Sequence, residues 1–177
     1  MRTLAQDERE VLRAVIGYIE KDRVEPRPAI SLLSLELLEE DEPDFVPDAV
    51  YAAKEKGIRF PAKTYADVLP RNRTRVALAP LVGDDSPARW ITEAQLDSMD
   101  AARRDDMNGD IRVLGEMFPG ATSMHWLSRP GFDPGRRHAA VAYGWNCGDL
   151  CGTVGLYLLE RRAGRWRVID RIVTLVS

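Results

Sequence analysis

Hydrophobic and polar positions in the last third of the chain, residues 123–177, follow the pattern of extended segments. Apolar runs rich in β-forming side chains are separated by short turns that contain glycine, which is typical of an antiparallel meander. We expect strands at 123–128, 138–145, 154–160 and 166–176. Both faces of the third strand are apolar, because Val154, Leu156 and Leu158 alternate with Tyr157 and Leu159. We therefore expect helices to cover one face of the sheet, and the N-terminal segment or another subunit to cover part of the other.

The first two thirds of the chain carry helical periodicity instead. Apolar residues between Leu4 and Lys21 recur at offsets of three, four and seven, which predicts one amphipathic helix. Capping residues and prolines delimit further helices, which we expect, in chain order, at 47–56, 64–69, 92–102 and 111–117. A brief strand is expected at 75–79, and residues 29–44 fit either a buried strand leading into a short helix or helix throughout.

Together these patterns predict an α+β fold, with N-terminal helices packed on a C-terminal antiparallel β-meander of about four strands. A chain of 177 residues can bury most of its apolar surface in one core. We therefore expect a single domain, 1–177, with a helical part over about 1–120 and the sheet over about 123–177.

The charge balance argues against one class of partner. A net charge of −3 does not favour nucleic-acid binding. The charge is nevertheless uneven, because the chain from Arg129 onward has eight arginines and four acids, whereas the preceding part is acidic. This asymmetry marks either a surface for a partner or ion pairing between the two halves of the chain.

The hydrophobic runs also bear on location. None approaches the roughly 18 apolar residues of a membrane helix, and the first residues lack the apolar core of an export signal. We expect a cytoplasmic protein, or an exported one if a signal peptide has been removed.

Both cysteines, Cys147 and Cys151, flank the predicted bend Gly148-Asp149-Leu150. They fit two separate thiols, a disulfide across the ends of two strands, or a role in catalysis or metal binding. Three residues separate them, so the two-residue spacing of thioredoxin-like redox motifs is absent.

The one enzyme hypothesis uses Cys151 as a nucleophile with His138 as its base, oriented by Asp149 or Asp133. The chemistry requires a thiol and an imidazole within hydrogen-bond reach. No phosphate-cradling loop or dinucleotide fingerprint is present. We expect no cofactor.

A metal site is not expected either. The run from Asp106 to Asp110 begins like a calcium loop, with oxygen ligands at the first, third and fifth places. Ile111 and Met117 then stand where such a loop needs glycine and a bidentate glutamate. Asp110 is better explained as the cap of the helix at 111–117.

Two further features have open interpretations. We expect Arg129 to be partly buried and paired with a carboxylate or with turn carbonyls, the alternative being an anchor for an acidic ligand. Trp126, Trp145 and Trp166 lie on strands predicted to be neighbours, so they form either an aromatic core or an exposed binding surface.

A set of short motifs spans the last fifty or so residues: Ser128, Arg129, Gly131 and Phe132, then Leu150, Cys151 and Gly152, then Leu158 and Leu159, then Gly164, Arg165 and Trp166, and finally Val176 and Ser177. In these the chain resembles a bacterial family of uncharacterised function. The final strands are also similar to those of cone-shaped NTF2-like domains, an analogy of fold alone. The resemblance implies a fold and brings no activity with it.

We therefore expect a non-enzymatic binding or protein-interaction module. Its candidate surface comprises the bend from Asn146 to Gly152, with Asn146 and Asp149 as binding residues, and the neighbouring Arg129. The alternative is a small hydrolase or thiol enzyme that uses Cys151 and His138. The expected partner is a protein or a small molecule, and a homodimer is open.

Overall fold

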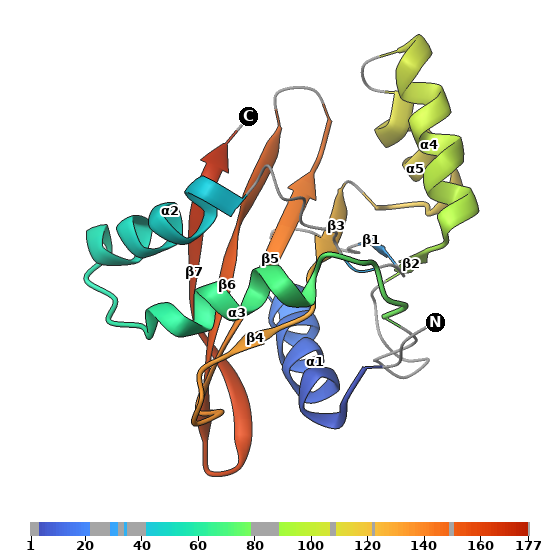
Figure 1. The fold of residues 1–177 in the computed structure, drawn as a ribbon. Helices are drawn as coiled ribbons and strands as arrows, with labels where there is room; N and C mark the ends of the chain where they lie inside the picture. Colours follow the sequence, from blue (N-terminus) through green and yellow to red (C-terminus); the bar gives the residue numbers. More distant parts are fainter. Residues whose placement is uncertain are drawn as a thin grey trace.

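The computed structural model describes residues 4–21, 29–31, 34, 42–78, 89–106, 109–121, 123–148 and 151–176. Its elements, in chain order, are α1 (Gln6–Lys21), β1 (Ala29–Ser31), α2 (Glu42–Glu55), α3 (Ala62–Arg71), β2 (Arg89–Ile91), α4 (Glu93–Asp105), α5 (Gly109–Met117), β3 (Met124–Leu127), β4 (Gly131–Phe132), β5 (His138–Asn146), β6 (Gly152–Arg162) and β7 (Arg165–Val176). The fold is α+β, as predicted (Figure 1).

The predicted meander is present, but it is only part of the sheet. The strand order is β2-β1-β3-β5-β6-β7, with β4 paired to β5, and the pairs from β3 to β7 are antiparallel. β1 runs parallel to both β2 and β3. The expected antiparallel sheet of about four strands is therefore wrong in strand number and direction: the sheet is mixed and has seven strands.

Three expectations for the first half of the chain need correction. Within the described residues 75–78, the strand expected at 75–79 is reduced to a single bridge residue, Ala77, and Val76 is tied to Ser34 by two hydrogen bonds of 2.9 Å. Of the alternatives for residues 29–44, the structure shows the strand at Ala29–Ser31, whereas residues 32, 33 and 35–41 lie outside the described part. The helix expected at 47–56 begins at Glu42, so Pro47 lies inside it. The helix expected at 64–69 extends from Ala62 to Arg71, with Pro70 in its last turn.

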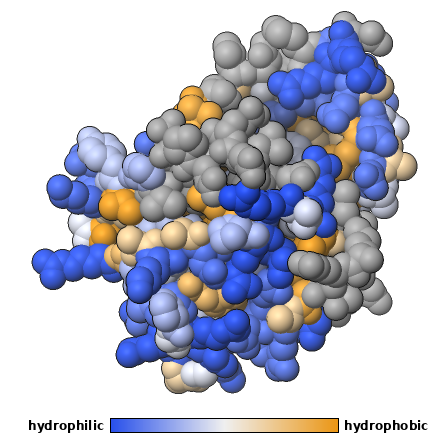
Figure 2. Space-filling model, viewed as in Figure 1, coloured by the Kyte–Doolittle hydropathy of each residue, from blue (hydrophilic) through white to orange (hydrophobic). Residues whose placement is uncertain are grey.

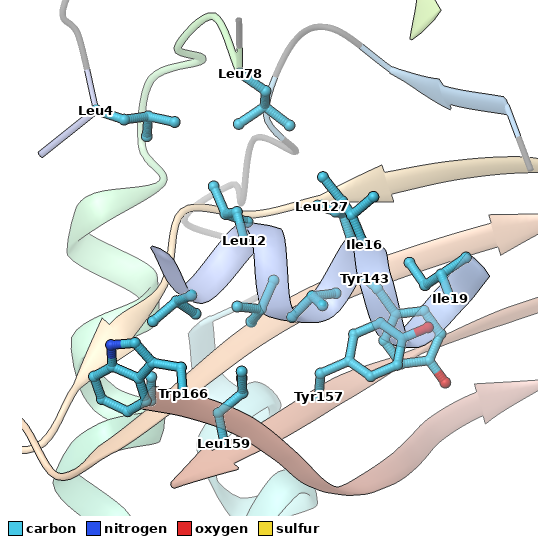
Figure 3. Close-up of a cluster of buried hydrophobic side chains, with 14 of the residues drawn as sticks. Leu4, Leu12, Ile16, Ile19, Leu78, Leu127, Tyr143, Tyr157, Leu159 and Trp166 are labelled. Atoms are coloured by element: carbon cyan, nitrogen blue, oxygen red, sulfur yellow. The ribbon is translucent and has the colours of Figure 1, made fainter. Parts of the chain in front are cut away.

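Three helical layers cover the sheet (Figure 1). On one face, the apolar stripe of α1 packs on the strands, and Leu12 and Ile16 belong to one buried cluster with Leu127, Tyr143 and Tyr157 (Figure 3). On the other face, α2 and α3 pack against alanines of β5 and leucines of β6. Helices α4 and α5 cover the end formed by β1, β2 and β3. The second cover expected for the sheet is therefore the N-terminal helix α1.

The last strand pair, β6 and β7, is long and carries two irregularities. The register shifts between Val154 and Gly155 and again between Leu158 and Leu159. At these points Thr174 and Ile169 of β7 have no residue opposite them, which is the arrangement of a β-bulge. β7 is also the terminal strand of the sheet on this side.

Gly155 is required by the close approach of β7. A Cβ atom at this position would fall on the carbonyl oxygen of Ile172 and would also lie 3.0 Å from the ring of Tyr143. At Gly144, by contrast, a Cβ atom would lie 3.6 Å from the nearest atom, in the ring of Trp126, an ordinary contact.

We predict that Gly155→Ala destabilises the fold by about 2 kcal/mol, because the methyl group forces two paired strands apart. Gly144→Ala is the matched change, because Gly144 of β5 stands opposite Val154, the neighbour of Gly155. This variant leaves the free energy of unfolding unchanged or slightly raised. Urea unfolding of both variants measures the difference. Equal stability of the two variants contradicts this account of β6 and β7.

Candidate functional site

The predicted bend lies where β5 passes into β6. Asn146 is the last paired residue of β5 and stands opposite Gly152. Cys147 and Cys151 are joined by a disulfide, with their Cα atoms 5.3 Å apart, within the range that a disulfide requires. The Cys147 amide also donates to the Cys151 carbonyl, 2.9 Å. Of the three alternatives for the cysteines, the structure shows the disulfide. Asp149 and Leu150 lie outside the described residues.

The structure does not bring Cys151 and His138 together. His138 begins β5 opposite Glu160, whereas Cys151 adjoins the other end of the same strand. Eight residues of extended chain separate His138 from Asn146, which is about 26 Å. The predicted pairing of Cys151 with His138 is therefore wrong: the two residues lie at opposite ends of β5, and the Cys151 sulfur is bonded to Cys147.

Asp133 fixes the turn before β5, and its Oδ2 atom lies 3.5 Å from Nδ1 of His138, as the hypothesis requires, although Cys151 is not beside this pair. Its Oδ1 atom accepts hydrogen bonds from the amides of His138, 2.7 Å, and Arg137, 2.8 Å. Burial alone would raise the pKa of this carboxyl, but these bonds and the nearby His138 ring outweigh burial and lower it. His138 itself packs edge-on against Phe60.

Arg129 is paired within the chain, as expected for its structural role. Its Nε atom donates to Glu8 Oε1, 3.0 Å, and its Nη2 atom lies 2.8 Å from the same oxygen. Its Nη1 atom donates to the carbonyl of Arg71, 3.2 Å. Glu8 is 2% exposed. Because a buried carboxylate of the chain already engages the guanidinium, the structure gives no support to Arg129 as an anchor for an acidic ligand.

The backbone around Arg129 is held as firmly as its side chain. The buried Asn72 accepts from the Arg129 amide, 2.7 Å, and donates to the Arg129 carbonyl, 2.9 Å. Two residues later, Gly131 packs on α3 so closely that a Cβ atom would lie 2.5 Å from the amide nitrogen of Val68. The Phe132 amide donates to Asp67, 2.8 Å. The motif from Ser128 to Phe132 therefore docks β4 onto α1 and α3.

The described residues at the bend border a hollow of about 400 Å³. Trp126, Gly144, Val154 and Leu175 are successive cross-strand neighbours on β3, β5, β6 and β7, so they form one row on one face of the sheet. Gly144 has no side chain and leaves the centre of the row open. The other lining residues are Arg103, Trp145, Asn146, Gly148, Gly152 and Thr153. We call this site the sheet-end hollow.

Polar groups fix one rim of the sheet-end hollow. Asn146 donates to the buried carboxylate of Asp110, 3.1 Å, and accepts from the amide of Gly148, 2.9 Å. The same carboxylate lies 3.9 Å from Arg103, whose side chain is 61% exposed. The helix α5 begins at Gly109, so Asp110 stands in its first turn and not at the expected cap position, and its carboxylate joins this helix to the bend. Asn146 is thereby held, and the guanidinium of Arg103 is presented to solvent.

The three tryptophans expected to be neighbours do not form one cluster. Trp126 packs against the layer of α4 and α5, whereas Trp145 and Trp166 belong to the α1 face. Trp145 pairs with Thr153 and Trp166 with Arg161, eight residues farther along β6. Trp126 and Trp145 both line the hollow, whereas Trp166 does not.

Sequence reasoning did not identify Leu175 and Arg103 as residues of this site, nor the lining residues Gly144, Thr153 and Val154. Apolar surface continues from the hollow along the end of β6 and β7, where Val154, Leu175 and Val176 are 39%, 61% and 71% exposed. Arg103 comes from α4, which no motif connects with the bend. Among the described residues there is no group of three or more potential metal ligands, and no described helix is long and apolar enough to cross a membrane.

We predict that Glu8→Ala lowers the free energy of unfolding by about 3 kcal/mol, because it leaves the guanidinium of Arg129 largely buried without its partner. Glu160→Ala, which removes an exposed pair with Arg162, lowers it far less, because solvent screens that pair. Chemical denaturation of the two variants provides the comparison. A similar loss of unfolding free energy in both variants would show that the buried Glu8–Arg129 pair contributes no more to stability than an exposed pair does.

We predict that Cys147 and Cys151 resist alkylation under non-reducing, denaturing conditions, because each sulfur is bonded to the other. Two alkyl groups add after reduction, and mass spectrometry counts them. The disulfide is disproved if both thiols are labelled without a reductant.

The chain was compared with known protein families, with curated proteins and with solved structures, and none of them matches it. The resemblance to an uncharacterised bacterial family and to NTF2-like strands therefore stays a prediction. The function of the site has to be argued from its own geometry.

Proposed function

We propose that this protein is a non-enzymatic interaction domain, whose sheet-end hollow receives an apolar side chain of a partner protein. The observation that carries the proposal is the open row from Trp126 to Leu175, in which Gly144 leaves a space between an aromatic wall and two exposed aliphatic residues. A side chain of the partner would fill this space and cover apolar surface that is now in water.

A protein partner suits the site better than a small molecule does. Small-molecule sites enclose most of the ligand surface, whereas Leu175 and Val176 are more exposed than buried. Exposed apolar surface that continues beyond a hollow and is rimmed by polar groups is characteristic of protein–protein contacts. The small-molecule alternative would leave this outer surface without an explanation.

The charges at the rim define the partner further. Arg103 projects beside the hollow with most of its side chain in solvent, and the neighbouring Arg104 is also exposed. The carboxylate of Asp110, 3.9 Å from Arg103, offsets part of this charge, and the two arginines together leave the rim positive. We therefore expect the apolar anchor of the partner to be flanked by Asp or Glu, which would pair with these guanidinium groups.

Selection of a displayed peptide library on the immobilised chain tests this function. We predict that the selected peptides share one aromatic or branched apolar residue flanked by acidic residues. Leu175→Glu weakens their binding at least tenfold, because it places a charge in the apolar wall and repels the acidic flanks. Gly144→Val, which fills the hollow, weakens it similarly.

Ile169→Glu is the matched control, because Ile169 is an exposed apolar residue on the same strand and does not line the hollow. Its peptide affinity should equal that of the unmodified chain. Peptides without acidic residues, or peptides that bind the Leu175→Glu variant equally well, contradict the proposal. Size-exclusion chromatography with light scattering checks one more outcome: a dimer that Leu175→Glu converts to a monomer would make a second copy of this chain the occupant, and would overturn the proposal of a different partner.

A further inference from the structure

A second hollow, of about 530 Å³, lies at the corner between α2 and α3 and shares no lining residue with the sheet-end hollow. Its apolar wall is formed by Val50 and Ala53 of α2, by Ile58 and Phe60 of the connecting segment, and by Tyr65 of α3. Figure 2 shows hydrophobic atoms among hydrophilic ones on the left of the molecule, where Figure 1 places α2 and α3. We call this site the corner hollow.

Tyr65 is the polar group within this apolar wall. The residue is 1% exposed, and its hydroxyl has no hydrogen-bond partner among the described residues. Burial raises the pKa of this phenol to about 12, so it stays protonated and can donate. A buried hydroxyl without an acceptor is unfavourable in the free protein. A ligand oxygen carried inward beside the rings of Phe60 and Tyr65, whose centroids are 5.4 Å apart, would supply that acceptor.

The rim of the corner hollow is positively charged. Lys54 and Arg59 both line it, both are exposed, and neither forms an ion pair with another residue in the described part of the chain. Lys54 also stands in the last turn of α2, where a cation favours the negative end of the helix. Arg59 has no such role, because it lies between the helices, and its charge points to a ligand of opposite sign.

We propose that the corner hollow binds a small aromatic carboxylic acid. The two aromatic rings and the aliphatic side chains would hold the ring of the ligand, since aromatic pairs add attraction beyond the area that they bury. Lys54 and Arg59 would pair with its carboxylate, and the Tyr65 hydroxyl would donate to an oxygen of the ligand. This site is independent of the proposed protein-interaction surface.

Phenylacetate serves as the probe, and its neutral isostere phenylacetamide as the control ligand, in calorimetric titrations of the full chain. We predict that phenylacetate binds in the micromolar to millimolar range and that phenylacetamide binds at least tenfold more weakly. Cyclohexylacetate, which keeps the charge and loses the aromatic ring, should bind several-fold more weakly than phenylacetate.

Four variants locate the site, two of them as controls. Arg59→Gln should weaken phenylacetate binding about tenfold, whereas Lys63→Gln, which removes an exposed lysine that does not line the hollow, should leave it unchanged. Tyr65→Phe should weaken binding about tenfold without lowering thermal stability, because the hydroxyl that it removes has no partner in the free protein. The Gly144→Val variant of the sheet-end hollow should bind phenylacetate normally.

Several results would overturn the proposal: no phenylacetate binding at ten millimolar or so, equal binding of the acid and the amide, or equal binding by the Arg59→Gln and Tyr65→Phe variants. Preference for cyclohexylacetate would reject the aromatic class. None of these results affects the peptide selection at the sheet-end hollow, so the two proposals fail separately.

Discussion

The buried ion pair between Glu8 and Arg129 is the constraint on which the arrangement of the layers depends. It joins α1 to the segment before β4, and Asn72 ties the same segment to the end of α3. A carboxylate that is 2% exposed is unfavourable unless a cation meets it in good geometry. This requirement fixes where α1 docks, and α1 supplies one side of the largest core cluster. The ion pair therefore fixes α1 against the segment before β4, whereas the other helical layers are held by their own apolar clusters.

The long elements of the fold could be predicted from the sequence because their periodicity extends over many residues. α1, α4 and the strands β5, β6 and β7 repeat their apolar positions for nine residues or more. β1, β2 and β4 have only two or three residues each, too few for any period to appear. They exist because neighbouring strands leave edges that need hydrogen-bond partners. The parallel pairing of β1 is thus a property of the assembled sheet and is absent from the local pattern.

The residues of the candidate site were likewise predictable only in part. Glycines and cysteines mark the bend after Asn146, and the internal pairing of Arg129 follows from the cost of burying a charge. The pairing register of the strands determines which of the other residues come together. Cys151 and His138 belong to adjoining segments of sequence, yet β5 carries them to opposite ends of the sheet. Leu175 and Arg103 meet at the hollow only because β7 pairs with β6 while α4 packs beyond β3. Contacts of this kind depend on tertiary packing and leave no local signature.

The two bulges in β7 affect how this terminal strand of the sheet can pair with a strand of another chain. An uninterrupted terminal strand of this length would be a template on which further chains could add by backbone hydrogen bonding. At Ile169 and Thr174 the ladder slips, so an incoming strand would meet a bent border with interrupted donors and acceptors. The bulges therefore make β7 a poorer template for an added strand, although aliphatic side chains are exposed along it. Recognition at this end is left to side-chain shape and charge.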